Sequence, residues 1–253
     1  MVYLSHLMNN LSGDAFLIFF RQETRMKTLM LSLFCFFLST STVMADISDQ
    51  RELLVESVQV LEEVQSSPDQ QIPADLIAKA KAIIVFPTLL KGGFIIAARY
   101  GSGVASVRNS KTGKWGPPAF LKTYGGSFGF QIGAEAVDLV LLVMTQRGIE
   151  GLLKSQFTLG ADMAVTAGPV GRHAEAGTDV TFKGEIYSYS RSKGAFAGVS
   201  LKGAVISADV DSNWGYYNRP LSPKDIMIEG RVKKYSESTR RFIKGIGRIA
   251  SIK

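Results

Sequence analysis

Apolar residues recur at helical spacing directly after residue 45. Over residues 46–65 they repeat every three or four positions, and glutamates occupy much of the opposite side of the projected helix. The apolar positions are Leu53, Leu54, Val58, Leu61 and Val64. Ser48 is the expected N-cap, and Pro73 fits the first turn of a second predicted helix over residues 74–81. The pattern therefore predicts two helices at the start of this region.

From residue 82 the pattern changes to short, β-prone segments separated by Gly, Asn, Ser and Pro. The first segment, residues 82–86, is expected to stop at Pro87. Further strands are predicted at residues 93–99, 103–109, 127–132, 137–144, 161–167, 185–191, 194–201 and 204–209. Residues 109–113 form a hairpin-type loop, and Thr145 is expected to cap an inserted helix over residues 148–154. We predict an α+β fold, with a β-rich antiparallel sheet, sandwich or partly closed barrel, N-terminal helices and one inserted helix.

A second amphipathic pattern lies near the end of the chain. Ser222, Pro223 and Asp225 are typical of a helix start. Further on, one helical face carries apolar side chains, namely Phe242, Ile246 and Ile249, with Ile243 beside them. The cations mostly lie elsewhere around the helix, namely Arg240, Arg241, Lys244 and Arg248. Two alternatives remain open: the segment contacts a membrane interface, or it docks its apolar face on its own domain.

The beginning of the chain has the pattern of an export signal. Met26 and Lys27 precede an apolar run over residues 29–38, and small residues lead to Ala45. A run of about ten residues is too short to span a bilayer, which needs about 20. We therefore expect residues 1–45 to be a signal region, with a true start at Met26 and cleavage after Ala45. The alternative is that all 45 residues form one long signal.

Cysteine and charge narrow the classes of function. Cys35 is the only cysteine, so a chain cleaved after Ala45 has no disulfide, catalytic thiol or cysteine-bound metal. Residues 46–230 hold 18 Lys/Arg and 19 Asp/Glu, whereas residues 231–253 hold eight and one. This basic tail, residues 231–253, predicts an anionic partner. For an exported protein, a lipid surface is favoured over nucleic acid.

Residues that could carry catalysis are few. His173 is the sole histidine after residue 45, which excludes a multi-histidine metal site, and it is interpreted as a turn or surface residue. Ser190 and Lys193 have the Ser-x-x-Lys spacing, but that chemistry needs a helical turn and this segment alternates like a strand. No phosphate-binding or dinucleotide fingerprint is present, so no cofactor is predicted.

Acidic residues leave two alternatives open. Residues 209–213 resemble half of a calcium loop but lack its glycine and its closing glutamate, and we interpret them as an Asp/Asn-rich turn. The remaining carboxylates could supply an acid–base pair or form structural salt bridges with arginines, and we favour the salt bridges. These carboxylates are Glu135, Asp138, Glu150, Asp162, Glu175, Asp179 and Glu185, and the arginines are Arg99, Arg147, Arg172 and Arg191.

Several motifs together resemble the SYLF domain family. They are AKAIIVFP at 80–87, KGGF at 91–94, YGSGV at 100–104, PAF at 118–120, GGSFG at 125–129, QIGAE at 131–135, FTLGAD at 157–162, AGPVGR at 167–172 and IYSYSRSKG at 186–194. The likeness covers roughly residues 50–230. It implies lipid binding without catalysis, and bacterial relatives are stand-alone exported proteins. In eukaryotic members a basic helix near the domain start contacts membranes; the corresponding helix here is acidic and holds only Arg51.

We therefore expect a non-enzymatic SYLF-like domain over residues 46–230, followed by the basic tail. Its expected partner is an anionic phospholipid membrane of the cell envelope, reached from the periplasm or the outer membrane. The expected lipid-binding residues are Arg240, Arg241, Phe242, Ile243, Lys244, Ile246, Arg248 and Ile249. The alternative is a structural or protein-interaction role in the envelope, with contacts from Tyr187, Tyr189, Tyr216 and Tyr217. A third hypothesis is a hydrolase that uses carboxylates such as Glu135.

Overall fold

The computed structural model divides the chain into two compact units, Met1–Met44 and Ala45–Lys253. It describes residues 47–66, 72–93, 96–128, 133–170, 184–192, 195–198 and 201–251. The predicted signal region, with Met26, Cys35 and Ala45, lies outside these residues, so its cleavage stays a prediction. The same holds for some residues discussed above, namely Arg172, His173, Glu175, Asp179 and Lys193.

The described residues form an α+β fold around one mainly antiparallel sheet. The helices are α3 (Ile47–Ser66), α4 (Ala74–Lys79), α5 (Gln146–Leu152), α6 (Val210–Tyr217), α7 (Pro223–Met227) and α8 (Glu237–Ile249). The strands are β1 (Ala82–Gly93), β2 (Ile96–Val107), β3 (Ala119–Phe128), β4 (Gly133–Val143), β5 (Gln156–Thr158), β6 (Val165–Ala167), β7 (Ile186–Ser192), β8 (Ala195–Gly198) and β9 (Val205–Ala208).

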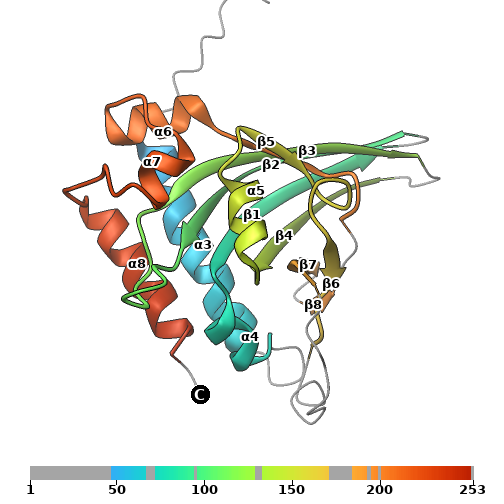
Figure 1. Ribbon diagram of the computed structural model, residues 1–253. Coiled ribbons are helices and arrows are strands. Elements are labelled where there is room, and N and C mark those ends of the chain that lie inside the picture. Colours follow the sequence, from blue (N-terminus) through green and yellow to red (C-terminus); the bar gives the residue numbers. More distant parts are fainter. Residues whose placement is uncertain are drawn as a thin grey trace, which may run out of the picture. The chain divides into compact units, whose positions relative to one another are not determined.

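The sheet is curled like an open half-barrel, with its long strands at the centre (Figure 1). Its order within the described residues is β5-β9-β3-β2-β1-β4-β7-β6, and β8 pairs with β7. The named pairs are antiparallel except β6 with β7, which is parallel. The predicted fold class is confirmed, in its form of a partly closed barrel with an N-terminal helix.

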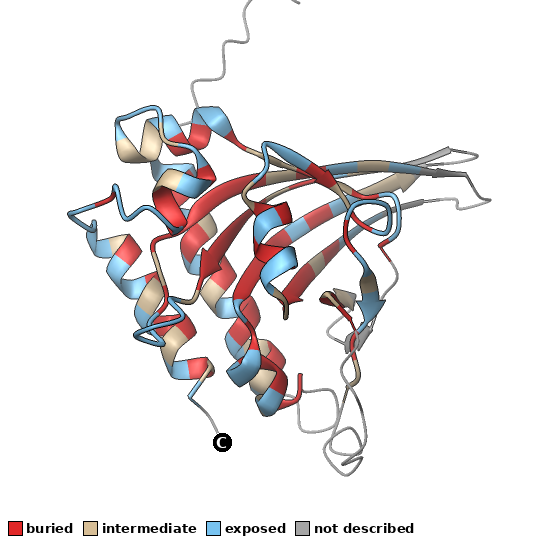
Figure 2. Ribbon diagram, in the orientation of Figure 1, coloured by how far each residue is buried: buried red, intermediate tan, exposed pale blue. Residues whose placement is uncertain are grey.

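Strand alternation divides the core into two layers. Side chains such as Val85, Val104 and Phe120 point to one face, where they pack with α3, α4 and α8. Side chains such as Ile84 and Leu141 point to the other face and pack with α5, α7 and the segment around β5. Both layers consist mainly of buried apolar side chains, whose removal from water is the main favourable contribution to folding. Figure 2 shows the buried inner sides and exposed outer sides of the helices.

Strand β1 passes through Pro87, so the expectation that it stops there is wrong. The pairing of β1 shifts register between Val85 and Leu90 on the β2 side, and between Phe86 and Leu89 on the β4 side. A proline in a central strand is tolerated at such a bulge, because the missing N–H falls where the ladder is already interrupted. Gly103 faces the bulge, and a Cβ at Gly103 would lie 2.4 Å from Cδ1 of Phe86.

Other segments differ from the predicted elements in extent or kind. The predicted strands 93–99 and 103–109 belong largely to one long strand, β2, and most of β3 and all of β5 were missed. Residues 209–213 are no turn, because the Asp209 side chain accepts a hydrogen bond from the Ser212 N–H at 3.1 Å and caps α6. The Thr145 cap is confirmed: its Oγ1 accepts from the Gly148 N–H at 3.0 Å.

Candidate functional site

Helix α8 forms where the second amphipathic pattern predicts it, and its apolar face docks on the domain. Ser236 caps it by accepting a hydrogen bond from the Thr239 N–H at 3.1 Å. Phe242, Ile246 and Ile249 are at most 3% exposed and belong to the core layer that also contains Leu54 and Leu61 of α3. Of the two alternatives for this segment, docking is the one that the structure shows. These side chains are buried in this conformation, Ile243 is half-buried, and lipid binding by the residues named above stays a prediction.

The close approach of α8 to α3 depends on a glycine. A Cβ at Gly245 would lie 2.6 Å from Cγ1 of Val58, whereas a Cβ at Gly247 would have no atom within 4 Å. By helix propensity alone, each of these glycines costs about 1 kcal/mol. The structure separates them, because Gly245 makes room for α3 and Gly247 does not.

Alanine at these two positions is expected to change stability in opposite directions. Gly247→Ala should raise the free energy of unfolding by about 0.5–1 kcal/mol, since it improves helix propensity in open space. Gly245→Ala should lower it by about 1–3 kcal/mol, because the stiff Val58 side chain must be displaced. Urea unfolding of both variants tests this, and equal stabilisation by the two substitutions would contradict the close packing of α8 on α3.

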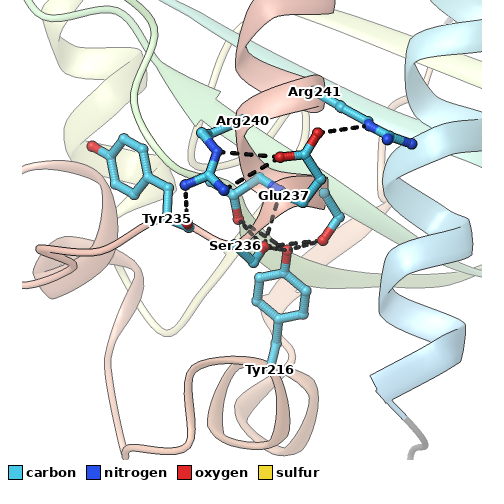
Figure 3. Close-up of polar contacts among 8 residues, drawn as sticks. Tyr216, Tyr235, Ser236, Glu237, Arg240 and Arg241 are labelled. Carbon is cyan, nitrogen blue, oxygen red and sulfur yellow. Dashed lines mark hydrogen bonds and ion pairs between the residues drawn. The ribbon is translucent and has the colours of Figure 1, made fainter.

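The outward side of α8 carries a cationic ridge, which we define as Arg240, Arg241, Lys244 and Arg248. All four are exposed. The Glu237 carboxylate pairs with Arg241 Nε at 3.0 Å and with Arg240 Nη2 at 3.3 Å (Figure 3). Arg248 pairs with Glu62 of α3. Hydrogen bonds from Arg241 and Arg240 lower the pKa of the Glu237 carboxyl. The ridge therefore stays positive overall, because two acids face four cations.

A cluster of hydroxyl groups fixes the start of α8 to α6. The Tyr216 hydroxyl lies 2.7 Å from Ser236 Oγ, 2.8 Å from Ser238 Oγ and 2.9 Å from Thr239 Oγ1 (Figure 3). The Tyr216 ring also makes an edge-on contact with Phe120, with 5.0 Å between centroids. Tyr216 therefore stabilises a contact between α6 and α8 within the domain. The sequence did not indicate this role.

An apolar groove runs between α3 and α8. Its volume is about 810 Å³. Leu54, Val58 and Phe242 contribute apolar surface, as does Val55, which is 61% exposed. Its lining also includes charged and polar residues, namely Arg51, Gln59, Glu62, Ser236, Glu237, Ser238 and Arg241. An elongated apolar surface beside cations suits an amphiphile with a negative end. The sequence signals for this groove were present in Arg51 and Val55, but only the packing of two distant helices brings them together with Arg241.

Two of the predicted salt bridges are present. Arg147 Nε lies 3.4 Å from Glu185 Oε1, and Arg191 pairs with Asp138 and also with Glu63 of α3. Burial and the nearby Glu56 charge raise the pKa of Asp138 to about 6. These contacts favour the structural interpretation of the carboxylates that the structure describes.

Two of the four tyrosines proposed as protein contacts are buried. Tyr189 is 0% and Tyr187 5% exposed, because both point from β7 into the layer below α3. They cannot contact a partner protein in this conformation, so that part of the alternative hypothesis is wrong. Tyr217 is partly buried, and its hydroxyl donates to the Pro118 carbonyl.

Nowhere in the ranges given above do three or more His, Cys, Asp or Glu side chains gather as they would around a metal ion. Among the same residues, no helix combines the length and the apolar character that crossing a bilayer requires.

Comparison with known proteins identifies the domain family. Residues 124–248 match the family model Ysc84, described as "Las17-binding protein actin regulator". The chain is 35% identical over 164 residues to human SH3 domain-containing YSC84-like protein 1, covering 64% of this chain and 47% of that protein. It is 36% identical over 168 residues to LAS seventeen-binding protein 3 of Saccharomyces cerevisiae, covering 65% and 36%.

Residues 124–248 thus carry the Ysc84 domain, which is the SYLF domain, and the resemblance drawn from the motifs is confirmed. The chain spans about half or less of the length of these curated relatives. The matched region ends within α8, so it includes the cationic ridge.

Proposed function

We propose that the protein is a non-enzymatic binding module that attaches to anionic phospholipid surfaces through its α3–α8 face. The observation that carries the proposal is the cationic ridge beside the apolar groove. Electrostatic attraction contributes about 1 kcal/mol for each Lys or Arg near an anionic membrane surface. Glu237 and Glu62 offset part of this attraction, whereas neither Lys244 nor Arg51 has an ion pair with a described residue. The ridge therefore supplies attraction without needing α8 to leave the domain.

The groove supports a role for the apolar part of the lipid. Its apolar surface can receive part of an acyl chain or of a lipid backbone, and each buried CH₂ group contributes about 0.8 kcal/mol. Arg51 and Arg241 line the same groove and can pair with a phosphate or carboxylate. In this proposal the charges of α8 contact the membrane, while Phe242 and its neighbours hold α8 in place.

We further propose that the protein works outside the cytoplasm, at an envelope membrane. The short apolar run over residues 29–38 and the small residues before Asp46 support this location. The relatives' printed descriptions name Las17 binding and actin regulation. A protein partner at the same face is the second candidate, and it predicts binding that does not depend on lipid charge.

Co-sedimentation with vesicles tests the proposal. Protein recovered from cells is first checked by amino-terminal sequencing, where Asp46 is expected as the first residue. It should bind vesicles that contain phosphatidylglycerol at low salt, bind them several-fold more weakly at about 1 M salt, where the Debye length falls to about 3 Å, and leave phosphatidylcholine vesicles unbound. Equal binding to both vesicle types, or none to either, would overturn the lipid proposal and favour the protein partner.

A further inference from the structure

A row of exposed bulky side chains crosses three neighbouring strands. Leu90 of β1 pairs directly with Tyr100 of β2, which pairs with Tyr124 of β3. Residues directly opposite one another point to the same face of a sheet. Leu90 is 56%, Tyr100 52% and Tyr124 41% exposed. The long strands run past the helices in Figure 1.

The face that carries the row is the face that α3 covers further along the strands. Tyr100 lies four residues before Val104 on β2, and Val104 belongs to the core layer beneath α3. The β2–β3 pairing is regular over this stretch, so the two residues point the same way. An apolar surface that is covered at one end of the sheet is thus left open at the other.

A row of small residues lies beside the bulky one. Gly92 pairs with Ala98, and Ala98 pairs with Gly126, two positions further along the strands. A hollow of about 550 Å³ lies beside this step from large to small side chains, and its lining includes Ala136 of β4 and three charged residues, Lys91, Arg99 and Glu135. We name the two rows together the platform, defined as Leu90, Tyr100, Tyr124, Gly92, Ala98 and Gly126.

The charges near the platform point away from it or are paired. Lys91 pairs in register with Arg99 and with Glu135, so these three alternate to the opposite face. On the platform's own face, Lys122 is the neighbouring residue of β3, and its Nζ lies 3.0 Å from Asp209 Oδ1. The platform itself therefore contains no charged side chain.

We propose that the platform is a self-association surface, on which a second copy of this chain packs face to face about a two-fold axis. The two-fold axis runs parallel to the two rows and midway between them. The bulky row of each copy then lies over the small row of the other copy. Tyr100 then lies over Ala98 of the other copy, and Leu90 over Gly92. Two sheets can approach to about 10 Å in such packing. A two-fold contact of this kind is self-complementary, because each patch meets its own copy.

The arrangement of charge favours a second copy over a lipid surface at this place. An anionic membrane attracts cations on the contacting face. Lys91 and Arg99 border the hollow, but strand alternation turns their side chains away from the face of the platform. The area is modest, since stable specific interfaces bury about 800 Å² on each partner and the platform's half-exposed side chains supply less. We therefore expect a dissociation constant of roughly 10 μM to 1 mM. Pairing would double the number of cationic ridges per particle and raise membrane avidity.

Sedimentation equilibrium of the purified protein, from about 1 μM to about 1 mM, tests the proposal across the expected range. The weight-average mass should rise toward twice the monomer value. Ala98→Leu should abolish the rise, because the larger side chain occupies the space that the bulky row of the other copy needs, even though it adds apolar surface. Tyr100→Ser should abolish the rise because it removes a bulky side chain from the contact. Ala78→Leu, at an exposed position of α4, is the matched control and should associate like the unchanged protein. Thermal melting by circular dichroism checks that each variant folds.

Two results would overturn the proposal. One is a mass that stays monomeric up to about 1 mM, where a contact of the expected strength would be populated. The other is association of Ala98→Leu as strong as, or stronger than, that of the unchanged protein, which would mean that the platform is a general apolar contact. Stronger binding of Ala98→Leu to phosphatidylcholine vesicles would identify lipid as the occupant instead. Because association is measured without lipid, its failure would leave the proposed membrane function standing.

Discussion

Replacing all four cations of the cationic ridge by glutamine is expected to lower the affinity for phosphatidylglycerol vesicles by roughly 1,000-fold. Each cation near an anionic surface contributes about 1 kcal/mol, so four contribute about 4 kcal/mol, and about 1.4 kcal/mol corresponds to a factor of ten. The variant should fold normally, because all four side chains are exposed and surface ion pairs contribute little to stability. Vesicle co-sedimentation at low salt measures the change.

A charge-matched control separates the ridge from net charge. Four exposed lysines elsewhere can be replaced by glutamine, namely Lys111, Lys114, Lys154 and Lys202. This control changes the net charge by the same amount but leaves α8 untouched, so it should keep most of the affinity. Equal losses in both variants would show that overall charge attracts the protein to the membrane. Unchanged binding of the ridge variant would refute the ridge as the lipid contact.

Helices were predictable where the local pattern and the tertiary structure agree. The apolar repeat of α3 and the Ser222-Pro223 start of α7 depend on neighbouring residues only, and both elements lie close to the predicted positions. For α6, Asp209 was taken as part of a turn, although an Asp that accepts from the N–H three residues on is equally a helix cap. Local sequence does not decide between these interpretations of the same residues.

Strand limits were predicted less well, because pairing partners determine them. Pro87 is a strong local stop signal, yet the bulge in β1 places it between two registers. The glycines of β2 were also interpreted as breaks between strands, whereas Gly103 leaves the space that the Phe86 ring occupies. Both features depend on strands that lie far apart in the sequence. The curled sheet could therefore be predicted as a class, but not strand by strand.

The candidate site was predictable in its charges and not in its shape. Arg240, Arg241, Lys244 and Arg248 are exposed, as the amphipathic pattern indicates. The pattern could not determine whether the apolar face of α8 meets lipid or protein, because both environments are apolar. The answer depends on α3, about 190 positions earlier in the chain. The shape of the groove and the function of Gly245 follow from that contact, which local sequence does not reveal.

Phe242→Ala is expected to lower the free energy of unfolding by about 3–5 kcal/mol, the usual cost of removing a buried aromatic side chain. Phe242 is 2% exposed and packs in the layer between α8 and the sheet. Such a loss is a large part of the roughly 5–15 kcal/mol that a domain typically has. Val55→Ala, at an exposed apolar position of α3, is the matched control and should change stability little. Urea unfolding in the absence of lipid measures both.

The same variant decides between the two uses of the apolar face of α8. If Phe242 holds α8 on α3, its loss reduces stability without lipid, and vesicle binding falls only as far as α8 detaches. If Phe242 instead enters the membrane, stability without lipid stays unchanged while binding to anionic vesicles is lost. A third pattern, with reduced stability but stronger vesicle binding, would mean that docking competes with insertion. In that case α8 would be a helix that the membrane can draw away from α3, and the cationic ridge would be the part that begins the transfer.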